Sequence, residues 1–360
     1  MWDDNTLEHT HKQNMLSTVG GIAALVAGGG ILLRRRVSRD WISRSSVVRD
    51  DRPRLARDRT IIITGGNAGL GYAAALDLAS LGGRIVLACR DVDAGERAAS
   101  RIRESTGNDS VDCARLDLSS LDSVWSFADE MTARGEEVFA LVCNAGVWVP
   151  DGDGGSRTRT EDGYEVHFGV NHLGHFALIR SLLPRMERSG IDGRIIIVSS
   201  SLCKAGKIDL IGRDFIYDGR VPDEGAKKSF APAGYCDSKL MNMLTCRELA
   251  VRLRGSNIST YAVSPGFCRS QLGRNVRMPL YKKALVAPIM RILQRSAQQG
   301  ALNIVHAVVE DKGALASGAM YQDGKIWQDS VELVETLGDD LQKELWEISE
   351  ELIMEKKRIV

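Results

Sequence analysis

The sequence lacks net charge of either sign, because 47 lysines and arginines balance 47 aspartates and glutamates. Proteins that bind nucleic acid usually carry a basic surface, so we expect no nucleic-acid partner. The sequence also lacks a Cys-x-x-Cys pair, and its 7 cysteines are odd in number. Cysteines inside apolar runs, such as Cys143, predict buried free thiols in a reducing compartment, and no metal site is expected.

Long hydrophobic runs are equally scarce. The single uncharged run of this kind is Leu16–Leu33, which as a helix would be about 27 Å long and close to one bilayer core. Asp3 and Asp4 precede this run and the basic residues follow it, an order that argues against a secretory signal or a cleaved transit peptide. We expect a retained membrane anchor, with an interfacial or re-entrant segment as the main alternative.

A basic stretch follows the apolar run. Between Arg34 and Arg59 there are ten arginines and four aspartates, a local charge of +6. The positive-inside rule then places everything after the anchor in the cytosol, and the arginines would lie against anionic headgroups. A solvated linker is the alternative interpretation, and both can hold together.

The next segment has the order of a dinucleotide-binding unit. A β-branched strand, Thr60–Thr64, runs into a glycine turn and then into a helix over Tyr72–Leu81. Glycines allow close backbone approach to a pyrophosphate, and the helix N-terminus supplies N–H donors and partial positive charge. The predicted cofactor-binding residues of this turn are Gly65, Asn67, Gly69, Leu70 and Gly71.

The end of the second strand bears on the choice of cofactor. The strand Arg84–Cys89 is followed by Arg90, where an NAD-selective site would place an acid for the ribose hydroxyl. An arginine can pair with a 2′-phosphate, which favours NADP(H) over NAD(H). Asp91 leaves an alternative open: it is either the ribose acid or the cap of the following helix.

Strands and helices continue to alternate, which predicts a Rossmann-type doubly wound parallel α/β sheet with ligands at its carboxyl edge. A long helix over about Tyr164–Arg188 would contain Asn171, although asparagine is mildly unfavourable inside a helix. The further predicted elements are strands at Val111–Leu116, Val138–Cys143 and Arg194–Val198 and a helix at Leu121–Ala133.

Tyr235 and Lys239 are four residues apart, so on a helix they share one face. Reduction of a carbonyl needs a proton for the developing alkoxide, which a phenol can donate. A nearby lysine ammonium would lower the phenol's pKa and help the reverse reaction. A serine hydroxyl can hold the substrate oxygen, and Ser199, Ser200 and Ser201 all follow a predicted strand.

These pieces together resemble the classical short-chain dehydrogenases/reductases. The matching elements, in the family's order, are Thr64-Gly65-x-x-x-Gly69-x-Gly71, Asp117, Asn144-Ala145-Gly146, Asn171, Ser200, Tyr235-x-x-x-Lys239 and Ser264-Pro265-Gly266. The resemblance implies that Tyr235 is the general acid–base, that Lys239 lowers its pKa and binds the nicotinamide ribose, and that Ser200 binds the substrate oxygen. Asn171 would hold a water in a proton relay to Lys239.

The resemblance also implies where the cofactor lies. Asp117 and Leu118 would sit by the adenine, Asn144, Ala145 and Gly146 would line the cleft, and Pro265 and Gly266 would lie beside the nicotinamide. Among the three serines, the family pattern favours Ser200. Cys143 stands where the family usually has asparagine, and we expect little effect from it.

Three features resemble the retinol dehydrogenase-like branch: the predicted anchor, the Cys89-Arg90-Asp91 strand end and the long segment between Ser200 and Tyr235. A membrane-tethered enzyme suggests a lipophilic substrate, such as a retinoid, a steroid, a polyprenoid or another lipid aldehyde, and the preference for NADP(H) that Arg90 indicates favours carbonyl reduction. The region from Phe267 to Leu293 would cap the substrate. The alternative function is a catalytically silent NADP(H)-binding membrane scaffold or redox sensor.

The sequence predicts five segments. They are a polar tail over residues 1–15, a single-pass transmembrane anchor over 16–33, a basic linker over 34–57, the catalytic domain over 58–345 and a C-terminal helical extension over 346–360. We expect the endoplasmic reticulum membrane, with the catalytic domain in the cytosol. A homodimer through the helices of Asn171 and Tyr235 is expected from the resemblance.

Overall fold

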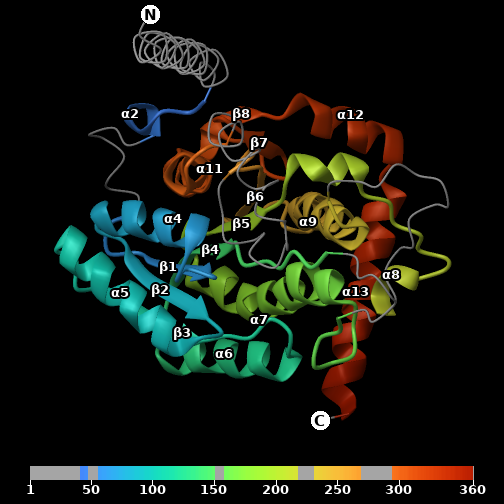
Figure 1. Cartoon of the computed structure of the whole chain (residues 1–360), viewed down its shortest axis with the longest axis horizontal. Helices are drawn as coiled ribbons and strands as arrows, with labels where there is room; N and C mark the ends of the chain where they lie inside the picture. The colour runs from blue at the N-terminus through green and yellow to red at the C-terminus, as the bar shows by residue number, and fades with distance from the viewer. Residues whose placement is uncertain (1–40, 48–55, 151–157, 218–230, 269–293, 360) are drawn as a thin grey trace, which may run out of the picture. The chain divides into compact units, whose positions relative to one another are not determined.

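The structure, a computed structural model, describes residues 41–47, 56–150, 158–217, 231–268 and 294–359 (Figure 1). The predicted anchor and almost all of the predicted lid lie outside these residues. In the described part of the chain, no helix is both long and apolar enough to cross a membrane. The described residues from Ile42 onward, apart from Gln294, belong to one compact unit, Ile42–Arg277 with Arg295–Val360.

The described residues form a sheet with the strand order β3-β2-β1-β4-β5-β6-β7-β8, in which every pairing is parallel except that of β7 with β8. This confirms the predicted doubly wound sheet, and the strand order reverses between β1 and β4 (Figure 1). The strands are β1 (Thr60–Thr64), β2 (Arg84–Cys89), β3 (Val111–Arg115), β4 (Val138–Cys143), β5 (Arg194–Val198), β6 (Ser259–Val263), β7 (Met320–Gln322) and β8 (Lys325–Ile326).

Helices cover both faces of the sheet, as Figure 1 shows. Ile61 and Ile63 of β1 face one hydrophobic core and Ile62 faces the other, because successive strand residues point to opposite faces. On the Ile61 side lie α2 (Arg44–Val47), α4 (Gly69–Ser80), α5 (Val92–Thr106) and α11 (Ala297–Val309). On the Ile62 side lie α6 (Leu121–Ala133), α7 (Gly174–Ser189), α9 (Ala233–Arg252), α12 (Gln328–Leu337) and α13 (Asp340–Ile359).

The remaining short elements are α8 (Asp214–Tyr217), the 3₁₀ turns η2 (Ser201–Ala205) and η4 (Lys312–Ala314), and a π-helical segment η1 (Phe168–Leu173). The sequence predicted one uninterrupted helix over Tyr164–Arg188, whereas the structure begins it with η1 before α7 takes over. A π segment shifts backbone bonding from i+4 to i+5 and is frequent at functional sites. Asn171 lies within it.

The C-terminal helix α13 is continuous across the boundary predicted at residue 345. Trp346 packs edge-on against Phe176 of α7 with ring centroids 4.7 Å apart, and Ile348 and Leu352 are buried in the same core. Arg180 of α7 donates hydrogen bonds of 2.8 and 2.9 Å to Glu350. Residues on both sides of the predicted boundary therefore belong to one packed unit.

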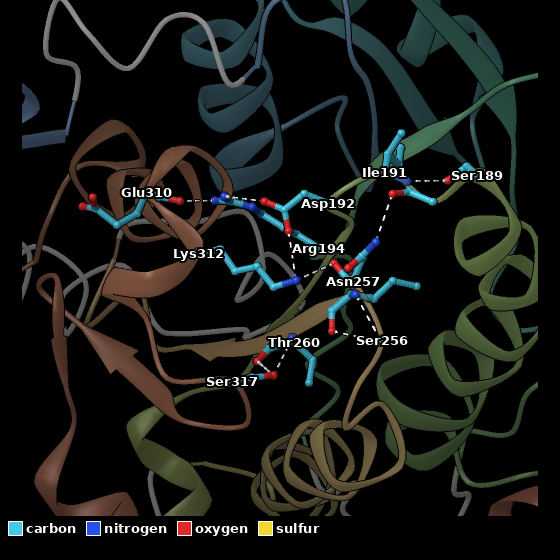
Figure 2. Close-up of polar contacts among 12 residues, drawn as sticks. Ser189, Ile191, Asp192, Arg194, Ser256, Asn257, Thr260, Glu310, Lys312 and Ser317 are labelled. Atoms are coloured by element: carbon cyan, nitrogen blue, oxygen red, sulfur yellow. Dashed lines mark hydrogen bonds and ion pairs between the residues drawn. The ribbon is translucent and has the colours of Figure 1, made fainter.

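A buried arginine holds the amino end of β5 to the end of α11 (Figure 2). Arg194 is 1% exposed, and its Nη1 donates to the carbonyls of Val308 (2.7 Å), Ala307 (3.4 Å) and Glu310. These carbonyls belong to the last turn of α11, where no intrahelical donor is left and a cation is favoured. Asp192 approaches the same guanidinium at 3.8 Å and also pairs with Lys312 at 3.3 Å.

We predict that Arg194→Met lowers the free energy of unfolding by about 2 kcal/mol or more, because it leaves buried carbonyls without a donor. Urea-induced unfolding of the full-length chain, followed by tryptophan fluorescence, measures this. Arg188→Met is the matched control, since Arg188 is exposed on α7 and its replacement should change stability by less than ~0.5 kcal/mol. Equal effects of the two substitutions would contradict the capping role.

Candidate active site

The site lies where β1, β4 and β5 end, at the edge at which the strand order reverses, as expected for an open parallel sheet. In the turn after β1, Gly65 and Gly69 have φ of +65° and +57°. A Cβ on Gly71 would lie 2.5 Å from the Gly65 carbonyl oxygen, so the helix start packs directly on the turn. Around Gly69 a Cβ would meet no atom within 4 Å.

The beginning of α4 suits an anionic group. Its N-cap residue, Ala68, gives no side-chain hydrogen bond, so the first-turn N–H groups keep their donor capacity. The open space at Gly69 lies at this helix end. These residues fit the pyrophosphate of a dinucleotide, which is what the sequence predicted for them.

The Thr64 side chain joins the ends of β1 and β4. Its Oγ1 accepts the backbone N–H groups of Asn144 and Ala145, both at 2.9 Å. The Asn144 amide in turn donates to the Thr64 carbonyl at 2.9 Å. The Asn144–Gly146 segment is thereby held beside the glycine turn, and a Cβ at Gly146 would lie 3.8 Å from Lys239 Nζ.

Two residues at the end of β2, Arg90 and Asp91, are the candidates for contacting the adenine ribose of the cofactor, and their surroundings differ. Arg90 is exposed, and Asp91 caps α5 by accepting the Ala94 N–H at 2.9 Å. This is the cap interpretation of Asp91 left open by the sequence. At the end of β3, the Asp117 carboxylate accepts the Ser119 N–H at 2.9 Å and the Ser119 hydroxyl at 2.8 Å, while Leu118 is buried.

Tyr235 and Lys239 lie close together on one helix, as their spacing predicts, and Ser200 lies beside Tyr235. Tyr235 lies in the first turn of α9, is 5% exposed and contacts the Ser200 hydroxyl. Lys239 Nζ lies 5.5 Å from the centroid of the Tyr235 ring and donates to the Val198 carbonyl at 2.9 Å. One turn of α9 and the end of β5 thus supply a phenol, an ammonium and a hydroxyl.

The three neighbouring serines have different surroundings. Ser199 is buried, and its hydroxyl donates to the Lys239 carbonyl at 2.7 Å, a bond that ties β5 to α9. Ser201 is exposed. Ser200 accepts the Leu202 N–H at 3.2 Å and is the serine whose hydroxyl contacts the phenol. The geometry therefore favours the serine that the family pattern favours.

Burial controls the protonation of this group. It raises the pKa of the Tyr235 phenol above its usual value of about 10, and the contact with Ser200 opposes this only in part. Burial also lowers the pKa of Lys239 to about 8. The sequence predicts that the ammonium lowers the pKa of Tyr235, whereas in the structure burial raises it. A phenol with a raised pKa keeps its proton near pH 7.

The Asn171 side chain is fully engaged within the protein. Its Oδ1 accepts the Val147 N–H at 2.7 Å, and its Nδ2 donates to the Val147 carbonyl at 3.1 Å and to the Ser238 hydroxyl at 3.0 Å. A water in a proton relay would therefore bind the main-chain carbonyl of Asn171. The relay itself stays a prediction.

Two aromatic residues at this site were not predicted. The Trp148 ring lies 4.6 Å from the Tyr235 ring, and the imidazole of His167 lies edge-on to it at 6.3 Å. His167 bonds Glu165 Oε1 at 2.7 Å through Nδ1 and accepts the Val149 N–H at 3.0 Å. The signals in the sequence were that Trp148 follows the Asn-Ala-Gly element closely and that His167 precedes Asn171 on the predicted helix.

Two further predicted cofactor-binding residues, Pro265 and Gly266, lie just after β6. Gly266 has φ of +74° and lies against the guanidinium of Arg295, which pairs with Asp323 at 2.6 and 2.8 Å. The Pro265 carbonyl accepts a hydrogen bond from the Cys268 thiol at 3.1 Å.

Six cysteines are buried and Cys268 is half-buried, all as free thiols. Among the described residues, no group of three potential metal ligands is found.

Comparison with known proteins agrees with this geometry. The family model described as short chain dehydrogenase matches residues 59–211. Retinol dehydrogenase 14 of Mus musculus is 33% identical over 347 residues, covering 94% of this chain and 98% of that protein. Retinol dehydrogenase 12 of Homo sapiens is 38% identical over 267 residues, covering 74% of this chain and 78% of that protein.

Solved structures show the same fold. An uncharacterized protein from Mycobacterium paratuberculosis is 29% identical, with a TM-score of 0.59 over 83% of this chain and 94% of that one. L-Sorbose reductase from Gluconobacter frateurii, complexed with NADPH and L-sorbose, is 20% identical with a TM-score of 0.57, covering 74% and 94%. The chain belongs to the short-chain dehydrogenase/reductase family, in its retinol dehydrogenase-like branch, and is an oxidoreductase of the CH–OH group.

Proposed function

We propose that this enzyme reduces a lipophilic carbonyl, such as a retinoid, steroid or lipid aldehyde or ketone, with NADPH. The observation that carries the proposal is the buried Tyr235 phenol in contact with Ser200 and within reach of Lys239. A neutral phenol at this position is prepared to give a proton, which is what a reductase needs. The relatives named retinol dehydrogenase support a lipophilic substrate.

The preference for NADP(H) over NAD(H) rests on the end of β2. Asp91 is occupied as the cap of α5, whereas the guanidinium of Arg90 is exposed next to it. A guanidinium matches the 2′-phosphate of NADP(H) in charge and geometry. The residues proposed to hold the dinucleotide are those of the glycine turn and α4, with Asn144–Gly146 and Pro265-Gly266 lining the cleft.

The bound nicotinamide supplies the hydride. Ser200 donates a hydrogen bond to the substrate carbonyl oxygen and so fixes it beside the phenol. Tyr235 then passes its proton to that oxygen as negative charge develops there. The phenolate left behind is stabilised by the Lys239 ammonium, and the proton is restored through a water on the Asn171 carbonyl.

We propose that the rings of Trp148 and His167, whose centroids lie 4.6 and 6.3 Å from that of the Tyr235 ring, line the substrate side of the site. Such a wall favours an apolar substrate body over a hydrated one.

We further propose that residues 16–33 anchor the enzyme in the endoplasmic reticulum membrane and that the catalytic domain faces the cytosol. An anchored site would receive lipid substrates directly from the bilayer. A homodimer stays a prediction. Because α13 packs on α7 and α9, such a dimer would have to include α13 or use another surface.

We predict that Tyr235→Phe lowers turnover by roughly 10²–10⁴-fold, because the proton donor is lost while the ring packing is kept. NADPH affinity, measured by fluorescence titration, should change by less than about threefold. Retention of turnover by this variant would contradict the proposed chemistry. No measurable turnover by the unmodified protein, together with an unchanged cellular phenotype of this variant, would favour the alternative of a catalytically silent cofactor-binding scaffold.

We predict that Arg90→Ala weakens NADPH binding by roughly 10- to 100-fold and NADH binding by less than about threefold, because only NADPH carries the 2′-phosphate. Dissociation constants from titration calorimetry test this. Arg97→Ala, at an exposed position on α5, is the matched control and should leave both constants unchanged. Tighter binding of NADH than of NADPH by the unmodified protein would rule out the proposed preference.

The substrate class is tested with the full-length chain in mild detergent. We predict NADPH-dependent reduction of at least one member of a panel containing retinal, a steroid ketone and a long-chain aldehyde. The aromatic wall should exclude L-sorbose, which serves as a hydrated control substrate. The Tyr235→Phe variant sets the background rate. Reduction of L-sorbose alone would overturn the lipophilic assignment while leaving the reductase chemistry intact.

A further inference from the structure

His175 connects the two halves of the site, although nothing in the proposed reaction uses it. It lies in the first turn of α7 and is 2% exposed. Its Nε2 is 2.8 Å from Thr64 Oγ1, the atom that joins the ends of β1 and β4. Its Nδ1 is 3.1 Å from the main-chain carbonyl oxygen of Asn171.

The partners of His175 determine where its protons lie. The Asn171 carbonyl can only accept, so Nδ1 carries the hydrogen. Thr64 Oγ1 already accepts two backbone N–H groups, which fills both of its lone pairs. Its own hydrogen must then point to Nε2 or to the Val142 carbonyl at 3.3 Å, and Nε2 is the nearer acceptor.

A protonated imidazole does not fit this arrangement. A hydrogen on Nε2 would require a third acceptor site on the Thr64 oxygen, which has none left. Burial, together with the nearby Lys239 charge, lowers the pKa of His175 to about 4, although the bond to Asn171 opposes this. The neutral Nδ1–H tautomer therefore satisfies every donor and acceptor in the cluster.

We propose that His175, as its neutral Nδ1–H tautomer, is a positioning residue that couples the cofactor cleft to the Asn171 carbonyl. Through Nε2 it directs the Thr64 hydroxyl so that its lone pairs face the N–H groups of Asn144 and Ala145. Through Nδ1 it fixes the direction of the Asn171 carbonyl inside the π-helical segment. The effect on kcat and the use of NADPH as the ligand rest on the proposed function, whereas the tautomer of His175 does not.

Two amide substitutions separate the contact of Nε2 with Thr64 from the contact of Nδ1 with the Asn171 carbonyl. Asparagine places its amide nitrogen near the position of Nδ1, and glutamine places its amide oxygen near that of Nε2. His175→Asn should keep turnover within about threefold and weaken NADPH binding roughly tenfold. His175→Gln should keep NADPH affinity within about threefold and lower kcat roughly tenfold. His175→Leu should both weaken NADPH binding and lower kcat.

His172 provides the matched control. It is a buried histidine of the preceding turn whose Nε2 bonds Ser349 Oγ at 2.9 Å, away from the cleft. His172→Asn and His172→Gln should alter thermal stability without separating kcat from NADPH affinity. If the His175 variants lose kcat and affinity together, in proportion to their loss of stability, His175 is merely structural and the proposal fails.

A measurement on the unmodified protein tests the tautomer without any substitution. The chain has 6 histidines, so selective ¹⁵N labelling of histidine gives few ring signals. His175 should show a protonated Nδ1 and an unprotonated Nε2 from pH 8 down to pH 5. The His175→Gln spectrum assigns the signal, and if that variant does not fold, Thr64→Val should shift the same Nε2 resonance. An Nε2–H tautomer overturns the proposal.

These readouts also separate two kinds of failure. If no carbonyl is reduced by the unmodified enzyme, the proposed function fails, while the tautomer still stands or falls independently. If reduction occurs but the Asn and Gln variants behave alike, the proposed function stands and the role of His175 is wrong.

Discussion

The hydrogen-bonded Thr64 hydroxyl is the constraint on which the geometry of this site depends. In a doubly wound sheet the chain leaves β1 toward one side and β4 toward the other, so their ends diverge. Thr64 opposes that divergence by accepting the backbone N–H groups that follow β4. The glycine turn on one side and the Asn144–Gly146 segment on the other thus form two walls of one cleft.

Buried hydrogen bonds hold the remaining functional groups in place beside this cleft. The Val198 carbonyl holds Lys239, and Ser199 holds the backbone of α9 to the end of β5. The Asn171 side chain holds Val147 and, through Ser238, the same helix. Each group thereby has a fixed partner before any ligand arrives, which is the preorganisation that electrostatic catalysis requires.

The sequence was sufficient for those features that depend on local pattern. Apolar β-branched runs located β1, β2, β4 and β5 correctly, and the four-residue spacing brought Tyr235 and Lys239 onto one face. Other features depend on tertiary packing and have no local pattern. Nothing in the residues around Asn171 distinguishes a π segment from an α-helix, and nothing near Trp346 indicates that it packs on Phe176.

The charged state of the site was the hardest feature to predict, because it depends on burial. From the residue types alone, an ammonium beside a phenol lowers the phenol's pKa. The structure buries both groups, and desolvation disfavours the charged form of each, raising the pKa of Tyr235 and lowering that of Lys239 to about 8. Both shifts favour the same protonation state, in which the phenol keeps its proton. Carbonyl reduction leaves the same buried phenolate that alcohol oxidation needs at its start, so the cost of burial applies to both directions and the Lys239 ammonium offsets it in both.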